Sequence, residues 1–257
     1  MTASPSDLPV GFFAGADGLP LALREMGEGR PLILIHGLFS NGWTNWVRYG
    51  HAARLAAAGF RVLMPDLRAH GQSAAPHDPL AYPPDILAED GLALLAHLGL
   101  GDGDYDLGGY SLGARTTARM MVRGARPRRA IMAGMGLSGM RDTGARAGFF
   151  RGVLRDFGLH ARGTPEWMAE AFLKTTGGDR HALLPLLDSF VDTSDAELAA
   201  IPTETLVLCG ASDQDNGSAA ALAGVLPHGR YVEIRGNHMT AVVEAGLGTA
   251  MVDFLAA

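Results

Sequence analysis

Cysteine is almost absent from this 257-residue chain, which contains only Cys209. A single thiol cannot form a disulfide within the chain, so a disulfide-stapled fold is excluded and a cytoplasmic location is favoured. Cys209 ends an apolar run over residues 205–209. We therefore predict that it is a buried, inert thiol rather than a nucleophile.

Long hydrophobic runs and a positive net charge are also missing. No stretch reaches the roughly 18 apolar residues of a membrane-spanning helix. The first seven residues have neither the basic head nor the apolar stretch of a secretory signal, so we expect none. The formal net charge of −6 argues against a nucleic-acid partner. Spacings typical of metal ligands, such as H-E-x-x-H, do not occur, and we expect neither a metal nor a cofactor.

The basic residues gather in one place, between positions 115 and 129. Arg115, Arg119 and Arg123 follow one another at intervals of four, which puts them on one stripe of a helix. We interpret this stripe as a solvent-exposed helix face. The alternative is a docking patch for an acidic substrate or partner. No feature of the sequence specifies an oligomeric state.

Apolar runs that suit strands alternate with segments of helical spacing along much of the chain. This alternation indicates an α/β fold with a mostly parallel sheet and helices on both faces. The run at 31–35 is continuously apolar, as expected of a strand buried on both faces. The predicted strands are 10–14, 19–25, 31–35, 60–66, 104–109, 128–133, 205–209 and 230–234. The predicted helices of this part are 43–58, 85–98, a helix after Ser111, and a C-terminal helix ending at Leu255.

Residues 135–200 differ from the rest because helical segments with many aromatic residues replace the strands. Thr164 before Pro165 marks one helix start, and Ser194 with Glu197 has the spacing of a capping box. We predict a helical lid, or cap domain, over 135–200, inserted between core segments 1–134 and 201–257. Most of its aromatic side chains are expected to pack the lid onto the core, and a minority to line a pocket.

The segment Gly109-Tyr110-Ser111-Leu112-Gly113 matches G-x-S-x-G, the signature of a nucleophile elbow. In such a turn the serine has strained backbone geometry, and the chain passes so close that only glycine fits on either side. The N–H of Leu112 is left free in the first helical turn, where it can hold an oxyanion. Because the chain contains 35 glycines, the pattern also arises by chance, and its meaning depends on its surroundings.

Three further candidates directly follow predicted strands: Leu38, Asp213 and His238. Ligands of a parallel sheet bind beyond the carboxyl ends of its strands, so the fold should bring these residues and Ser111 to one edge. There an imidazole can take the serine proton, and a carboxylate can orient the imidazole. Asp215 competes with Asp213 for the role of the acid, and the G-x-x-D spacing after the strand favours Asp213.

Over nearly its whole length the chain resembles the α/β-hydrolase superfamily, in its lidded esterase and haloperoxidase-like branch. The resemblance rests on the elbow and on residues 36–38, 66–73, 210–213 and 236–238, all in the right order. It implies the α/β-hydrolase fold, with Ser111 as nucleophile, His238 as general base and Asp213 as its partner. It also implies that the backbone N–H groups of Leu38 and Leu112 form the oxyanion hole.

Other residues near these motifs receive different interpretations. Ala69 departs from the family pattern, in which glycine often precedes the histidine at this place. His36 and His70 are predicted to shape loops through hydrogen bonds, because neither follows the acid in chain order. Ser138 lacks the second glycine of an elbow, and Asp142 is a remoter candidate for the acid.

These features together predict a carboxylesterase-like serine hydrolase that cleaves an ester, or a similarly activated acyl bond, of a small molecule through an acyl-enzyme. The apolar lid suggests a hydrophobic substrate group. Lactone hydrolysis, carbon–carbon bond hydrolysis, acyl transfer and cofactor-free perhydrolysis use the same triad and stay open. An aspartate instead of Ser111 would indicate a dehalogenase or an epoxide hydrolase. From another class, a non-catalytic binder of a small ligand is the alternative, because a fold does not fix a function.

Overall fold

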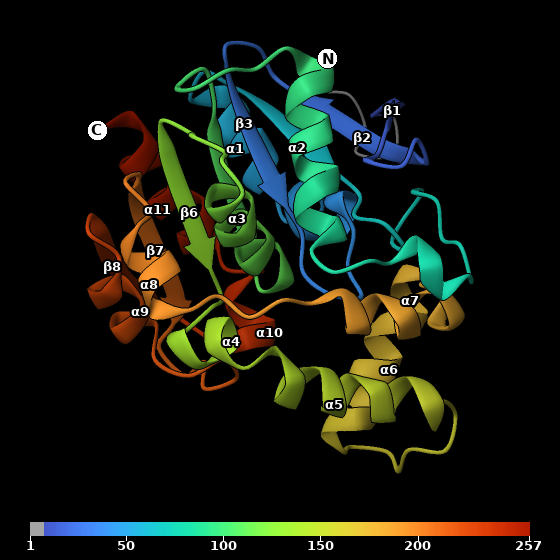
Figure 1. Ribbon diagram of the computed structural model, residues 1–257. Coiled ribbons are helices and arrows are strands. Elements are labelled where there is room, and N and C mark those ends of the chain that lie inside the picture. Colours follow the sequence, from blue (N-terminus) through green and yellow to red (C-terminus); the bar gives the residue numbers. More distant parts are fainter. Residues whose placement is uncertain (1–7) are drawn as a thin grey trace.

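The computed structural model describes residues 8–257, which form an eight-stranded sheet with helices on both faces (Figure 1). The strand order is β1-β2-β4-β3-β5-β6-β7-β8. Strand β2 pairs antiparallel with β1 and β4, and the other pairings are parallel. The predicted α/β fold is therefore confirmed. The strands are β1 (Val10–Ala14), β2 (Pro20–Met26), β3 (Arg30–Ile35), β4 (Phe60–Pro65), β5 (Asp106–Tyr110), β6 (Arg129–Ala133), β7 (Glu204–Gly210) and β8 (Gly229–Ile234).

The sheet separates two hydrophobic cores. Helices α2 (Ile86–Leu98), α3 (Leu112–Val122) and α9 (Ala219–Val225) cover one face, and α1 (His51–Ala57) and α11 (Ala245–Ala256) cover the other. Along β3, Ile33 and Ile35 belong to the first core, and Leu32 and Leu34 to the second. Successive side chains of a strand point to opposite faces, so the apolar run of β3 is buried on both sides, as predicted.

Between β6 and β7 the chain forms a series of helices at the end of the sheet to which the strand arrows point (Figure 1). Thr164 caps the helix that begins at Pro165, and Ser194 with Glu197 forms the predicted capping box. These segments are α4 (Leu137–Arg141), α5 (Thr143–Arg155), α6 (Pro165–Thr176), α7 (Arg180–Leu186), a 3-10 turn (Leu187–Ser189) and α8 (Asp195–Ala199).

One predicted helix is interrupted. We expected a single helix over 43–58, and the structure instead has a π-helical turn, Trp43–Val47, followed by α1. Gly50 lies between them with φ of +80°, a left-handed conformation that ends one helix before the next begins. None of the helices in the described part, residues 8–257, combines the length and apolar character needed to cross a membrane.

The prediction of a solvent-exposed arginine stripe on α3 is wrong for two of its three members. Arg115 is 5% exposed and Arg119 is 7% exposed. Arg119 forms ion pairs with Asp85 before α2 and with Glu197 of α8, which cover this part of α3. Only Arg123, at the end of the helix, has an exposed side chain. Spacing identified the stripe correctly, but distant segments of the chain bury it.

Candidate active site

Ser111 lies in the turn between β5 and α3, with φ of +56° and ψ of −113°. Residues other than glycine rarely adopt this conformation. A Cβ on Gly113 would lie 2.0 Å from the carbonyl oxygen of Ile35, and one on Gly109 would lie 2.2 Å from the carbonyl carbon of Gly113. The backbone at Gly113 lies against that of Ile35, and the backbone at Gly109 lies against that of Gly113, too closely for a side chain in either place. Both glycines are therefore sterically required.

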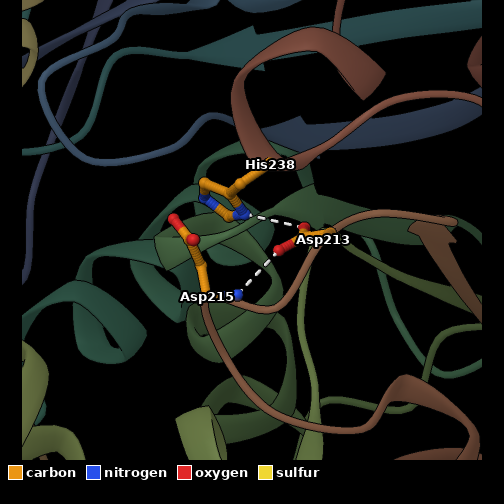
Figure 2. A group of neighbouring side chains, drawn as sticks. All are labelled: Asp213, Asp215 and His238. Atoms are coloured by element: carbon orange, nitrogen blue, oxygen red, sulfur yellow. Dashed lines mark hydrogen bonds and ion pairs between the residues drawn. The ribbon is translucent and has the colours of Figure 1, made fainter. Parts of the chain in front are cut away.

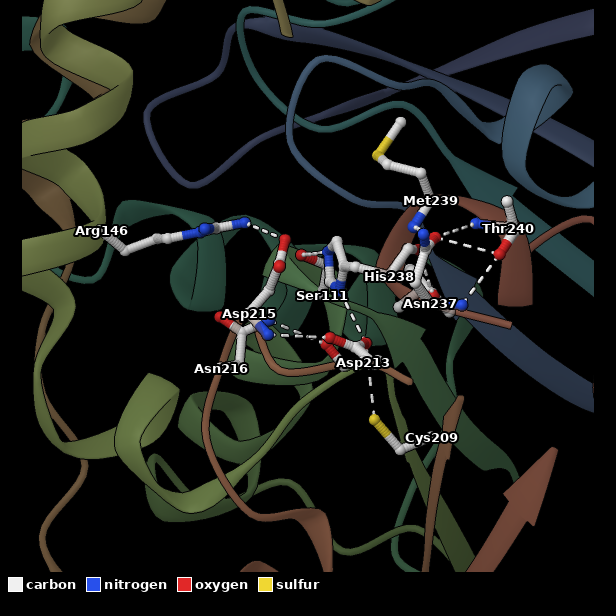
Figure 3. A network of polar contacts seen from close by, with 12 residues as sticks. Ser111, Arg146, Cys209, Asp213, Asp215, Asn216, Asn237, His238, Met239 and Thr240 are labelled. Carbon is white, nitrogen blue, oxygen red and sulfur yellow. Dashed lines mark hydrogen bonds and ion pairs between the residues drawn. The ribbon is translucent and has the colours of Figure 1, made fainter. Parts of the chain in front are cut away.

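The side chains of Ser111, His238 and Asp213 form one continuous hydrogen-bonded chain. His238 Nδ1 lies 2.9 Å from Oδ2 of Asp213 (Figure 2), and His238 Nε2 lies 3.0 Å from Oγ of Ser111 (Figure 3). A carboxylate only accepts hydrogen bonds, so Nδ1 of the neutral ring carries the proton and Nε2 is left to accept from the serine. Both distances lie within the reach that a serine nucleophile and its base require.

Two neighbours fix the backbone of His238, which begins the short helix α10 (His238–Ala241) after β8. The side chain of Asn237 caps this helix by accepting the N–H groups of Met239 and Thr240. The Tyr110 hydroxyl donates a 2.6 Å hydrogen bond to the carbonyl oxygen of His238. Burial raises the pKa of Tyr110 well above its usual value, so the phenol remains a neutral donor.

Asp213, and not Asp215, accepts the hydrogen bond of the imidazole. Burial acts to raise the pKa of Asp213, but its hydrogen bond to His238, its electrostatic attraction to that ring and a backbone hydrogen bond outweigh burial and hold the pKa below the usual value. The backbone N–H of Asp215 adds a 3.0 Å hydrogen bond to Asp213 Oδ1. The carboxylate of Asp215 instead accepts a 2.7 Å hydrogen bond at Oδ2 from Nη2 of Arg146 in α5 (Figure 3). Asp213 therefore stays ionised beside the ring.

The ligand atoms of Asp213, Asp215 and His238 lie within 4.8 Å of one another and so form a group to be tested as a cation site (Figure 2). Nδ1 of His238 and Oδ2 of Asp213 are engaged with each other, and the carboxylate of Asp215 is engaged with Arg146. A cation would have to break both interactions. A metal centre needs ligand atoms that are free for the ion. The arrangement therefore fits the hydrogen-bonded Ser111, His238 and Asp213, with Asp215 paired to Arg146, better than it fits a metal centre.

Cys209 lies next to this group, with its Sγ 3.5 Å from Oδ2 of Asp213. Burial, together with the negative charge of Asp213, raises the pKa of the thiol to about 12. A neutral thiol is a weak donor and no nucleophile at neutral pH. The predicted burial of Cys209 is confirmed, and the raised pKa agrees with the expectation that the thiol is inert.

Two buried histidines link the loop that contains Leu38 to the loop after β4. His70 Nε2 accepts the N–H of Phe39 at 3.1 Å, and His36 Nε2 accepts the N–H of Leu67 at 2.9 Å. Each Nδ1 lies within 2.9 Å of a backbone carbonyl oxygen, to which it donates. Burial lowers the pKa of both rings, that of His70 to about 3, so both remain neutral. The predicted loop-shaping role of these histidines is confirmed.

Leu38 and Leu112, whose backbone N–H groups are the predicted oxyanion donors, both line the small pocket at Ser111. Neither N–H has a protein acceptor among residues 8–257. Leu112 is the first residue of α3, where N–H groups have no partner within the helix, and the positive φ of Phe39 (+62°) turns the chain just after Leu38. Two free amides beside a serine are the arrangement that can stabilise an oxyanion.

A cavity of about 460 Å³ opens over Ser111 and His238. Helices α5 and α6 supply its apolar wall, and Phe39 of the loop after β3 and Met239 of α10 contribute from the sheet edge. Apolar walls around a few polar groups are typical of small-molecule sites. The residues from α5 and α6, including the start of α6, are Arg146, Phe149, Phe150, Pro165, Met168, Ala169 and Phe172.

Two arginines also line this site. Arg115 was predicted only as part of the arginine stripe, with a docking patch for an acidic substrate or partner as the alternative, and Arg146 was not singled out. Arg115 and Arg146 line a smaller inner pocket together with Ser111 and Leu112. A signal for the first was present, because Arg115 follows Ser111 by four residues and so lies one helical turn from it on the same face. Arg146 had no such signal, since it comes from a different helix, α5.

Comparisons with known proteins agree with the fold and with the resemblance inferred from the motifs. Residues 32–249 match the model of the alpha/beta hydrolase family. The rat bifunctional epoxide hydrolase 2 is 38% identical over 97 residues, which are 38% of this chain and 17% of that protein. A non-heme haloperoxidase from Rhodococcus erythropolis is 33% identical over 114 residues, 44% of this chain and 38% of that protein. The matches thus cover less than half of either relative.

The crystal structure of a hydrolase from Pseudomonas aeruginosa PA01 superposes with a TM-score of 0.73 at 26% identity, over 96% of this chain and 98% of that one.

Proposed function

The chain belongs to the alpha/beta hydrolase family, and on that premise we propose that it is a serine hydrolase that cleaves a carboxylic ester, or a similarly activated acyl bond, through an acyl-enzyme. The observation that carries the proposal is the hydrogen-bonded chain from Asp213 through His238 to Ser111. This chain lies at an apolar cavity large enough for a small molecule.

The identity of the nucleophile selects among the reactions of the relatives, which include an epoxide hydrolase and a haloperoxidase. A serine that opened an epoxide would become an ether, which water does not cleave under mild conditions. A serine that attacks an acyl group becomes an ester, which an activated water molecule hydrolyses. Ser111 therefore favours an acyl substrate.

In the proposed reaction, Ser111 Oγ attacks the carbonyl carbon while His238 Nε2 takes the hydroxyl proton. The N–H groups of Leu38 and Leu112 donate hydrogen bonds to the carbonyl oxygen and so stabilise the negative charge that develops on it. The bond to the alcohol then breaks, and His238 gives its proton to the leaving oxygen. Water then attacks the acyl carbon of the acyl-enzyme while His238 takes its proton. The bond from the acyl carbon to Oγ breaks, His238 returns the proton to Oγ of Ser111, and the acid is released.

Asp213 and the helices between β6 and β7 support these steps. An ionised Asp213 holds the ring of His238 in one tautomer and stabilises the imidazolium that forms. We assign residues 135–200 the role of a lid, because α5 and α6 form the apolar wall over Ser111. Such a wall excludes water and strengthens the electrostatic interactions of the site. Phe149, Phe150 and Phe172 favour a hydrophobic group on the substrate.

Hydrolysis of p-nitrophenyl esters of increasing acyl length by the wild-type protein and by Ser111→Ala tests the proposal. The wild-type protein should turn over at least one of these esters, and Ser111→Ala should lose at least about a thousandfold in kcat/KM. Ser138→Ala is the matched control, since Ser138 lies in α4 outside the cavity, and it should keep the wild-type rate. Retained turnover in Ser111→Ala, or none in the folded wild-type protein, contradicts the proposal.

A further inference from the structure

One arginine beside the proposed nucleophile is buried without an acidic partner. Arg115 lies one turn after Ser111 and is 5% exposed, with its guanidinium carbon 5.3 Å from the ring centroid of Phe190. Its Nη2 donates a 2.7 Å hydrogen bond to the carbonyl oxygen of Gly139. Its Nε–H is buried and has no partner in the part of the chain that the structure describes. A buried guanidinium with a free donor can accept a further ligand.

Arg119, one turn farther along α3, shows how a buried arginine is otherwise satisfied in this protein. It pairs with the carboxylates of Asp85 and Glu197. Burial lowers the pKa of Arg115 to about 10, an effect that Asp192 opposes through its charge and Arg146 reinforces. Arg115 therefore stays charged at neutral pH, yet it forms no ion pair with a carboxylate among residues 8–257. A buried charge in this state is destabilising until an anion accompanies it.

Arg115 and Ser111 border the same small pocket. Its free volume is about 20 Å³, and it shares Leu38, Ser111, Arg146 and Phe150 with the 460 Å³ cavity as common walls. That volume suits one small polar group, because one water molecule needs about 10–15 Å³ of free volume. A group attached to a substrate at Ser111 can therefore reach Arg115 without leaving the protein.

We expect the far end of the acyl part, rather than the alcohol part, to enter this inner pocket. The inner pocket is bordered by deeply buried residues such as Leu112, Met135 and Arg115. The larger cavity is bordered by Met168 and Met239, whose exposed fractions of 55% and 53% mark its opening to solvent. The alcohol leaves first and needs a way out, whereas the acyl group stays bonded to the serine.

We propose that the acyl group of the substrate carries a carboxylate, and that Arg115 binds this carboxylate in the inner pocket. This inference rests on the proposed hydrolase function and narrows its substrates to monoesters of dicarboxylic acids. Arg146 adds positive charge to the same wall, although Asp215 holds it at 2.7 Å. The net charge of the chain is −6, so its long-range field does not attract an anion and the recognition has to be local.

The test compares p-nitrophenyl hydrogen glutarate with p-nitrophenyl valerate, a neutral ester with the same number of acyl carbons. The wild-type protein should prefer the charged ester in kcat/KM by about tenfold or more, the range of a hydrogen bond to a charged group. In Arg115→Gln the ratio of the two kcat/KM values should fall to near one. Arg123→Gln changes an exposed arginine on the same helix, and it should keep the wild-type ratio.

Each other outcome is decisive. Equal kcat/KM for the two esters in the wild-type protein overturns the inference and leaves the hydrolase function standing. Turnover of neither ester overturns the inference, and it overturns the hydrolase function as well only if no p-nitrophenyl ester of the acyl-length series is turned over. A preference that survives in Arg115→Gln overturns the role of Arg115. If Arg115→Gln does not fold, inhibition of the wild-type protein decides instead. Glutarate should inhibit valerate ester hydrolysis competitively and at a lower concentration than neutral glutaramide, and equal inhibition by the two overturns the inference.

Discussion

The hydroxyl oxygen of Tyr110 lies 2.6 Å from the backbone carbonyl oxygen of His238, to which it donates a hydrogen bond. Tyr110 directly precedes Ser111, so the residue before the proposed nucleophile holds the backbone of the proposed base. The two rings also lie close together, with centroids 5.5 Å apart. The hydrogen bond from Tyr110 to His238 thus connects the turn that contains Ser111 to the proposed base, in addition to the hydrogen bonds between Ser111, His238 and Asp213.

Tyr110→Phe should keep the ring and remove only this hydrogen bond. We expect kcat to fall by about tenfold with little change in KM, because His238 is displaced while the cavity is kept. The free energy of unfolding should fall by about 1–2 kcal/mol, since a buried carbonyl loses its partner. Steady-state kinetics and urea denaturation measure the two effects. A stability loss with an unchanged kcat would show that Tyr110 does not position the base.

The stability of the protein should depend on the protonation of His70. The pKa of His70 is about 3 in the folded protein, against 6.5 without perturbation, so between these values the unfolded chain binds a proton that the folded one does not. The stability that neutral His70 contributes is fully present above about pH 6.5, and it is lost progressively as the pH falls toward 3. Over this range the free energy of unfolding should fall by at most about 1.4 kcal/mol for each pH unit because of His70.

His70→Gln tests this linkage, because an amide oxygen can still accept the N–H of Phe39 but does not titrate. Urea denaturation at pH 7 and pH 4.5 should show a smaller loss of stability in the variant than in the wild-type protein. His36, whose pKa is also lowered by burial, is present in both proteins. An identical pH dependence of the two proteins would contradict a neutral, buried His70.

The elbow should not tolerate a methyl group at Gly113. An added Cβ would lie 2.0 Å from the carbonyl oxygen of Ile35, which belongs to the neighbouring strand and cannot move freely. We expect Gly113→Ala to lower the free energy of unfolding by about 3 kcal/mol or more. Gly152→Ala is the control, because its Cβ points into open space on α5, and it should stabilise by about 0.5–1 kcal/mol. Wild-type stability of Gly113→Ala would refute the steric account.

Replacing the two neighbouring aspartates should separate their roles. Asp213→Asn should lower kcat by about 10⁴-fold, because an amide in place of the carboxylate favours the wrong tautomer of His238. Asp215→Asn loses only a partly exposed ion pair with Arg146 and should lower kcat by less than about tenfold. Kinetics with a p-nitrophenyl ester measures both. The reverse order of effects would assign the acid to Asp215.

Much of the fold and of the candidate site could be predicted from the sequence, because their signals are local. The apolar run of β3 indicates a strand buried on both faces, and G-x-S-x-G specifies a turn whose glycines have a steric reason. The meeting of Ser111, Asp213 and His238 could be predicted as well. Their separation along the chain does not matter, since parallel strands end at the same edge of the sheet.

The features that could not be predicted depend on contacts between distant segments. The stripe of Arg115, Arg119 and Arg123 has the same spacing whether it faces water or α8, so its burial leaves no mark in the sequence. The rotation of each helix between β6 and β7 about its own axis decides which aromatic side chains face the cavity. Phe172 of α6 borders that cavity, whereas Trp167 of the same helix packs under Arg162.

Labelling with a fluorophosphonate, followed by mass spectrometry of the intact protein and of its peptides, tests most directly whether Ser111 is an activated nucleophile. We expect a single label on the peptide that contains Ser111, and none on Ser111→Ala. His238→Ala should react at least about a hundredfold more slowly, because the serine then lacks its base. Folded wild-type protein that stays unlabelled, or carries the label on another residue, would contradict the assignment of Ser111.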